Sequence, residues 1–332
     1  MEEITSTIYD VARLAGVSMA TVSRVVNGNM NVKENTRVKV LAAVKELDYR
    51  PNAIARGLAS KKSTTIGVVM PSFMHSIYSR IVIGIDDVAR MYNYTILVAN
   101  SEDDEKKEIS VINELIAKQV DGIILMGNRI SEALRSQISR MRTPIVLAGM
   151  IDHEGQVPTV TIDHEKATFE AVGLLASRNE KVAMVSGPLT TGINSMRFSG
   201  YKQALKKFKR EFSEARVIET DYSYKKGYAL VERIKATGAT AVYVTDDEVA
   251  AGLLNGLLDS GVRVPEEVEI MASNNTIVTN FTRPNMSSID QPLYDVGAVS
   301  MRFLTKIINK EEVEDKVAIL PYRIEIKKST RQ

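Results

Sequence analysis

The chain has 332 residues, of which 44% are hydrophobic and 25% charged, with a net charge of +2, as in an ordinary water-soluble protein of two or three domains. It has no cysteine, which excludes disulfides and thiolate chemistry, and its three histidines, His75, His153 and His164, lack metal-ligand spacing. No apolar run reaches the roughly eighteen residues of a membrane span, and the start MEEITSTIYD is unlike a signal peptide, so we expect a cytoplasmic protein.

The charge is unevenly distributed along the chain. Residues 1–62 carry ten Lys or Arg against six Asp or Glu, a net charge of +4, whereas the remainder carries 33 against 35, a net charge of −2. A small basic head on a near-neutral body is a weak indication of a polyanionic partner.

The first 48 residues show helical periodicity and no strand signal. We expect Gly16 to end a first helix, Ser18 to cap a second that stops at Asn27-Gly28-Asn29, and Asn35 to cap a third. Three short helices with a tight turn between the first two are the helix-turn-helix arrangement. The apolar positions at helical spacing are Ile8, Val11, Ala12 and Ala15; Val22, Val25 and Val26; and Val40, Leu41, Val44 and Leu47.

The second of these helices is the candidate recognition helix. If its valines face the core of the head, the early small and polar side chains face outward and the helix can enter the major groove. There Arg24 could pair with guanine and Met19 could contact a thymine methyl group. Periodicity alone equally allows a plain surface helix. The residues expected on or beside the open side are Ser18, Met19, Ala20, Thr21, Ser23 and Arg24.

The segment RPNAIARGLASKK, residues 50–62, is a short helix candidate that joins the head to the body. Pro51 suits a first helical position, but barely two turns follow and Gly57 interrupts them. Such a helix is marginal alone, and Ile54 and Leu58 need something to pack on. A flexible linker is the alternative.

From Thr64 onward, short runs rich in Val and Ile alternate with helical segments. Strands that are apolar throughout and alternate with helices predict parallel sheets covered on both faces. Some ten candidate strands are too many for one compact sheet, so we expect two lobes with a cleft between them. The runs are TTIGVVMP, YTILVAN, VDGIILMG, TPIVLAG, KVAMVSG, TAVYVTDD and VEIMASN.

The helix predicted from Leu293 to Asn309 carries a charged stripe. At 100° per residue, Asp295, Arg302 and Lys306 fall within about 40° of one another, roughly opposite Leu304, Ile307 and Ile308. A solvated face is the ordinary interpretation of such a stripe. We interpret the basic run KQALKKFKREF in the same way.

Three function classes can be compared. An enzyme is not expected, because the chain has neither the phosphate loops GxGxxG and GxxxxGK[ST] nor the nucleophile motif GxSxG. A solute-binding protein would have two lobes but no basic helical head. A DNA-binding regulator accounts for head, joint and body together.

The head sequence, TIYDVARLAGVSMATVSRVVNGN continuing to RPNAIARGLASKK, resembles the LacI/GalR family of bacterial repressors. The resemblance extends over the body and implies a small all-α helix-turn-helix head followed by an α/β two-lobed core of the periplasmic-binding-protein type I kind, with parallel sheets. The implied divisions are a head at 1–50, a hinge helix at 51–62 and a core at 63–332. Within the core, lobe 1 is about 63–161 plus 291–322, and lobe 2 is about 162–290 plus the C-terminal end.

The resemblance implies how the joint acts. In this family the hinge helix pairs with its copy in a dimer and enters the minor groove, where a leucine, here Leu58, wedges between base pairs at the centre of a pseudo-palindromic operator. The implied DNA contacts are Thr7, Tyr9, Ser18, Met19, Ala20, Thr21, Ser23, Arg24, Asn27, Tyr49, Asn52, Ala55, Arg56, Leu58 and Lys61.

The resemblance also implies an effector cleft. MRFSGYKQAL supplies Arg197 and VTDDEVAAG supplies Asp247, whereas the third segment reads Ala272-Ser273-Asn274 where many sugar-responsive relatives have Gly-Phe-Asp. An amide lacks the charge that accepts hydrogen bonds strongly from sugar hydroxyls, which argues against specific sugar recognition. A structural ion pair is an equal alternative for Arg197. No cofactor is expected beyond a small sugar phosphate as an adjunct effector.

The segment QPLYDVGAVSMRFLTK resembles the corresponding segment of family members that repress or activate genes in response to carbon catabolites. In these the helix docks the phosphocarrier protein HPr phosphorylated on a serine. The resemblance implies that Arg302 clamps the phosphate, because arginine donates to phosphate oxygens in a bidentate way. The alternative is a sugar-responsive repressor of a single carbohydrate operon. The implied HPr contacts are Tyr294, Asp295, Arg302, Lys306 and Arg323.

Overall fold

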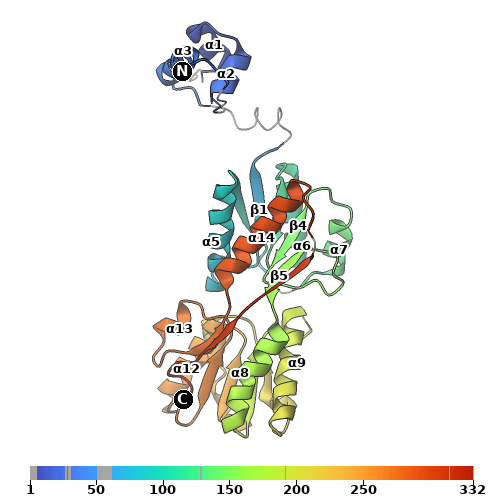
Figure 1. Ribbon diagram of the computed structural model, residues 1–332. Coiled ribbons are helices and arrows are strands. Elements are labelled where there is room, and N and C mark those ends of the chain that lie inside the picture. The colour runs from blue at the N-terminus through green and yellow to red at the C-terminus, as the bar shows by residue number, and fades with distance from the viewer. Residues whose placement is uncertain are drawn as a thin grey trace. The chain divides into compact units, whose positions relative to one another are not determined.

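The computed structural model describes residues 6–26, 28, 31–50, 62–127, 129–190, 192–313 and 315–331. The chain divides into two compact units, Met1–Ser63 and Thr64–Gln332, which are the head and the body. Figure 1 labels the helices and strands of both units.

The head is a cluster of three helices, α1 (Ile8–Ala15), α2 (Met19–Val26) and α3 (Glu34–Glu46). Gly16 ends α1 in the left-handed conformation with φ of 65°, and the Ser18 hydroxyl accepts a hydrogen bond from the Thr21 amide at 3.2 Å, as predicted. The core of this unit consists of Val11, Ala12, Val22, Val25, Val40 and Ala43.

Two predictions for α3 were wrong. Leu41 is exposed, and Ala43 is buried instead, because position 41 lies 100° around the helix from Val40 whereas position 43 lies only about 60° from it. The residue that precedes α3 is Lys33, so Asn35 lies inside the first turn and does not cap the helix.

The body contains two six-stranded sheets, each forming one α/β lobe (Figure 1). The strand orders are β11-β5-β4-β3-β1-β2 and β12-β10-β9-β8-β6-β7. Neighbouring strands pair in parallel except β10 and β12, which are antiparallel. Consecutive elements change sheet after β5, after β10 and after β11, so three crossovers join the lobes. The predicted fold class is confirmed.

The elements of the first lobe are β1 (Thr65–Met70), α5 (Ser76–Met91), β2 (Thr95–Asn100), α6 (Glu105–Ala117), β3 (Gly122–Leu125), α7 (Glu132–Ile138), β4 (Ile145–Ala148), β5 (Thr159–Ile162), α14 (Leu293–Ile308) and β11 (Val317–Leu320). Separate apolar clusters cover the two faces of its sheet, one with α5 and α14 and the other with α6 and α7. This two-sided cover explains why its central strands are apolar throughout.

The elements of the second lobe are α8 (His164–Arg178), β6 (Val182–Ser186), α9 (Gly192–Lys207), a 3₁₀ turn (Glu214–Arg216), β7 (Val217–Glu219), α10 (Tyr224–Tyr228), α11 (Val231–Thr237), β8 (Ala241–Val244), α12 (Asp247–Asp259), β9 (Glu269–Ala272), α13 (Val278–Phe281), β10 (Ser287–Asp290) and β12 (Arg323–Glu325). Helices α11 and α12 contribute to one apolar cluster, and α8 and α9 to the other.

Helices α5 and α14 touch through their backbones. A Cβ atom placed on Gly84 would lie 2.1 Å from the Tyr294 carbonyl oxygen, and one placed on Gly297 would lie 2.0 Å from the Ile81 carbonyl oxygen. Only glycine permits so close an approach, so the two helices interlock through their backbones. None of the described helices is long and apolar enough to span a membrane.

Candidate functional site

The predicted DNA-contacting residues of the head that the structure describes lie at or near its surface. Thr7, Tyr9, Ser18, Met19, Ala20 and Arg24 are exposed, and Thr21, Ser23 and Tyr49 are half-buried. Tyr49 packs against the core of the head. Arg24 has no acidic partner within 4.0 Å in the part of the chain that the structure describes, so its guanidinium is available to an external acceptor.

Thr7 also caps the N-terminus of α1 in the head. Its hydroxyl donates to Asp10 Oδ2 at 2.7 Å and its backbone amide donates to the same oxygen at 3.0 Å, which closes the first turn of α1. These hydrogen bonds lower the pKa of Asp10. The predicted contacts Asn27, Asn52, Ala55, Arg56, Leu58 and Lys61 lie outside the described residues.

A cavity of about 60 Å³ lies between the two lobes and contains two of the three predicted cleft residues. Arg197 is buried and donates to the Thr245 carbonyl oxygen at 3.1 Å and to Asn274 Oδ1 at 3.3 Å. Its Nε has no hydrogen-bond partner among the described residues. Asn274 also accepts from Gln291 Nε2 at 2.9 Å, so its amide oxygen is already used within the chain.

Asp247, the third predicted cleft residue, does not line this cavity. Its carboxylate is fully buried, and burial raises its pKa. It accepts four hydrogen bonds from the loop after β9: from the amides of Ser273, Asn274 and Thr276 and from the Thr276 hydroxyl. The neighbouring Asp246 lines the cavity instead. In a helix start that reads Asp-Asp-Glu, sequence alone does not show which carboxylate faces the cleft.

Sequence reasoning missed a group of ionisable side chains at the cleft rim, contributed by both lobes. His75, which precedes α5 in lobe 1, lies 3.7 Å from Glu248 on α12 in lobe 2, measured from Nδ1 to Oε2. Glu248 Oε1 accepts from the Ser76 amide at 3.1 Å and from its hydroxyl at 2.9 Å. The partners are 172 residues apart in sequence, so no local pattern could reveal them.

The surroundings of these groups shift their pKa values in different directions. The neighbouring Glu248 raises the pKa of His75. Burial opposes ionisation of Glu248, but hydrogen bonds from His75 and Ser76 lower its pKa to about 2. Burial and the nearby Glu248 charge raise the pKa of Asp246 to about 7.

The same three side chains are close enough to share a metal ion, with ligand atoms within 4.8 Å of one another. Each carboxylate, however, already accepts a backbone amide, Asp246 from Val249 and Glu248 from Ser76. The positive ends of α5 and α12 also face this point and oppose a cation. The geometry therefore favours an ion pair between His75 and Glu248.

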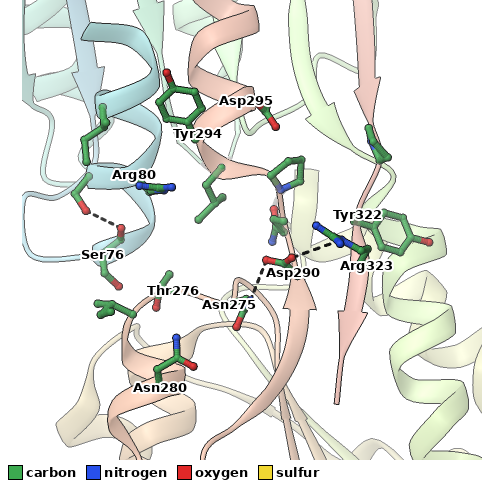
Figure 2. A pocket seen from close by; sticks show the side chains of 17 residues that line it. Ser76, Arg80, Asn275, Thr276, Asn280, Asp290, Tyr294, Asp295, Tyr322 and Arg323 are labelled. Atoms are coloured by element: carbon green, nitrogen blue, oxygen red, sulfur yellow. Dashed lines mark hydrogen bonds and ion pairs between the residues drawn. The ribbon is translucent and has the colours of Figure 1, made fainter. Parts of the chain in front are cut away.

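A second hollow between the lobes, a groove of about 880 Å³, shares Gln291 and Leu293 with the small cavity (Figure 2). Three of the predicted HPr contacts, Tyr294, Asp295 and Arg323, line it. Tyr294 is held by α5, because its hydroxyl donates to Asp87 at 3.1 Å and Arg80 lies 5.6 Å from the centre of its ring. Figure 2 shows Arg323 turned toward Asp290, 4.0 Å away.

The remaining two predicted HPr contacts, Arg302 and Lys306, lie further along α14. Both are exposed, as is Asp295, and the buried side of the helix includes Val296, Met301 and Leu304. Neither Arg302 nor Lys306 has an acidic partner within 4.0 Å in the described ranges. The predicted stripe therefore exists as an outward-facing set of charges.

Comparisons with known proteins match both units. A family described as bacterial regulatory proteins, lacI family, matches residues 7–52, and one described as periplasmic binding proteins and sugar binding domain of LacI family matches residues 63–329. Catabolite control protein A of Streptococcus mutans is 57% identical over 328 residues, which is 98% of each chain.

Solved structures match as well. The transcription regulator CcpA of Lactococcus lactis superposes with a TM-score of 0.77 at 42% identity, covering 80% of this chain and 99% of that one. The lac repressor dimer bound to operator and an anti-inducer superposes with a TM-score of 0.87 at 27% identity, covering 98% of this chain and 99% of that one.

Proposed function

The chain belongs to the LacI family of DNA-binding transcription regulators, and from this premise we propose that it controls catabolite genes as a homodimer whose operator binding is enhanced by serine-phosphorylated HPr. Membership of this family confirms the predictions of a DNA-binding regulator and of a protein that is not an enzyme. The homodimer, the symmetric operator and the phosphoprotein partner are the proposed parts.

The size of the recognition helix supports the homodimer. Helix α2 has eight residues, and only its early side chains can reach base edges, which is too few for a specific site. Two copies related by a two-fold axis would read two half-sites of a pseudo-palindromic operator.

Exposed apolar side chains on the body supply a candidate surface for dimer formation. Ile83 on α5 and Ile277 beside α13 are both exposed and line the groove of Figure 2 from the two lobes. Phe281 on α13 is also exposed, as are Leu97 and Val98 on β2, an edge strand. Exposed apolar groups on both lobes favour a second copy that contacts both.

The observation that carries the partner proposal is the pair of exposed cations on α14. A phosphoserine adds a charge of about −1.5 to −2 and three acceptor oxygens, so Arg302 can distinguish it from an unmodified serine. Because α14 interlocks with α5 through Gly84 and Gly297, the docking helix is rigid. If HPr binds more tightly to the DNA-competent arrangement of the protein, thermodynamic linkage makes the two effects equal. HPr must then raise the affinity for the operator by the same factor by which the operator raises the affinity for HPr.

Operator titrations of an Arg302→Ala variant test this proposal. We expect the gain in operator affinity caused by serine-phosphorylated HPr to disappear, while the affinity without HPr stays close to that of the native protein. Arg233→Ala is the matched control, because Arg233 is an exposed arginine on α11 in the other lobe. A full response of Arg302→Ala to phosphorylated HPr would refute the assignment.

The second candidate is a repressor that answers a sugar in the cleft. The buried Arg197, whose Nε lacks a partner among the described residues, favours it. The cavity of about 60 Å³ argues against it, because ligand pockets for small molecules are typically about 300–1,000 Å³. A native protein that answers a free sugar with a gain comparable to that from phosphorylated HPr would favour this candidate.

A further inference from the structure

The N-terminus of α5 is capped by a residue of the opposite lobe. The residue that precedes α5, His75, makes no capping hydrogen bond with its own side chain. Instead, Glu248 Oε1 accepts from both the amide and the hydroxyl of Ser76, the first residue of the helix. A carboxylate at this end of a helix also interacts favourably with the helix dipole.

Helix α12, which carries Glu248, does not need this side chain as its N-terminal cap. Helix α12 is capped by Asp246, whose side chain accepts from the Val249 amide at 3.0 Å. Glu248 lies in the first turn of α12 and its side chain reaches out of lobe 2 to Ser76 and His75 of lobe 1. Its hydrogen bonds therefore connect the lobes, in addition to the favourable effect of an acidic side chain in the first turn of α12.

The cavity behind this contact is already nearly closed. Its volume of about 60 Å³ is well below the roughly 300–1,000 Å³ of typical small-molecule pockets. The polar groups of the cavity are mostly engaged with one another, as in the contacts of Arg197 with Thr245 and Asn274. Contacts of the chain itself therefore connect the two lobes at this point.

We propose that Glu248 is a built-in latch, a side chain whose contacts hold the two lobes closed. In a two-lobed protein that closes around its ligand, the bound ligand bridges the lobes, whereas here Glu248 makes the bridge at the cleft rim. Opening the cleft would leave the Ser76 amide without its cap and separate Glu248 from His75. Because α5 interlocks with α14, the latch also fixes the helix that carries Tyr294 and Arg302. The latch does not depend on the identity of the partner that docks there.

The absence of cysteine from the sequence makes a direct distance measurement simple. Spin labels on Glu132→Cys in lobe 1 and Asp221→Cys in lobe 2, both exposed positions, report the separation of the lobes by pulsed electron resonance in the full-length protein. We expect one closed population in the native background. Glu248→Ala should raise the ratio of open to closed molecules by about tenfold or more, and Glu248→Gln by less because the amide oxygen can still accept.

Two further variants distinguish a latch from a general loss of stability. Ser76→Ala removes one donor without touching lobe 2, so it should open the lobes partially, and adding Glu248→Ala to it should have less than the additive effect. Glu232→Gln is the control, since Glu232 pairs only with Lys235 on α11 among the described residues. If Glu248→Ala does not fold, as shown by circular dichroism, Ser76→Ala and Glu248→Gln carry the test.

Either of two results would overturn the proposal. One is an unchanged distance distribution in every folded variant of Glu248 and Ser76. The other is a native protein that is open after treatment with a chelator and closes only when Zn²⁺ is added, which would assign the rim to a metal ion.

Discussion

The cleft and the outer face of α14 both carry charged side chains, but they use them differently. At the cleft, Arg197, Asp246 and Glu248 are bound to groups of the chain itself, and little volume remains. On α14, Arg302 and Lys306 face outward without an acidic partner in the described ranges. Charges satisfied within the chain stabilise one arrangement, whereas unpaired charges on a rigid helix are available to a partner.

The largest expected effect is at the contact that makes α14 rigid. Gly297→Val would place a branched side chain against the Ile81 carbonyl oxygen, where even a Cβ atom would lie 2.0 Å away. We expect a loss of several kcal/mol in the free energy of unfolding, enough to prevent folding of lobe 1. Thermal denaturation measures it. The matched comparison is Gly297→Ala against Gly127→Ala, because a Cβ atom on Gly127 would lie 3.8 Å from the nearest atom outside its chain neighbours, the Met150 sulfur; equal stability of these two variants would contradict the interlocked pair.

The adjacent residues Asp246 and Asp247 allow a cleft-facing carboxylate to be compared with a structural one in the same part of lobe 2. Asp247→Ala removes the acceptor of four hydrogen bonds in a fully buried position and should cost about 3 kcal/mol or more of stability. Asp246→Ala should cost about 1 kcal/mol, the value of a helix cap. Denaturant titration of both variants checks the order, and a larger loss for Asp246→Ala would reverse the assignment.

The latch should also depend on pH. Because the folded pKa of Glu248 is lowered to about 2 from 4.5, its contribution is present above pH 4.5 and is lost as the pH falls toward 2. Because the folded pKa of His75 is raised above 6.5, its contribution is full below 6.5 and is lost as the pH rises through the raised value. Ionisation of Asp246 near pH 7 adds repulsion with Glu248.

Stability measured against pH should therefore show a latch contribution of a few kcal/mol at most, greatest between about pH 4.5 and 6.5. His75 also faces Asp103, so the alkaline limb includes that group. Glu248→Gln should flatten this part of the profile. A profile of Glu248→Gln parallel to that of the native protein would remove the ion pair from the account.

The smallest expected effect concerns base choice by the head. Arg24→Ala should cost about 1–3 kcal/mol of discrimination at one base pair of each half-site without changing the fold, because the exposed side chain has no acidic partner in the described part of the head. Competition binding with single-base operator variants measures this. Unchanged discrimination would place Arg24 away from the base edges.

Periodicity predicted what depends on neighbours in sequence. The helices of the head and the stripe of Asp295, Arg302 and Lys306 follow from a spacing of 3.6 residues, and the strands of both lobes follow from short runs that are apolar throughout. Leu41 was misplaced because adjacent apolar residues in α3 leave its buried face ambiguous. The latch could not be predicted, since it depends on how two lobes close around three crossovers, which brings Ser76 to Glu248.

The central claim of the comparison is that the regulatory signal binds at α14 and not in the cleft. Affinity of the native protein for a palindromic operator, measured alone, with unmodified HPr, with serine-phosphorylated HPr and with a hexose phosphate alone, tests this most directly. We expect a gain of about 1–3 kcal/mol from the phosphorylated protein, and little from the other two additions. An equal gain from the hexose phosphate alone would contradict the account and place the signal in the cleft.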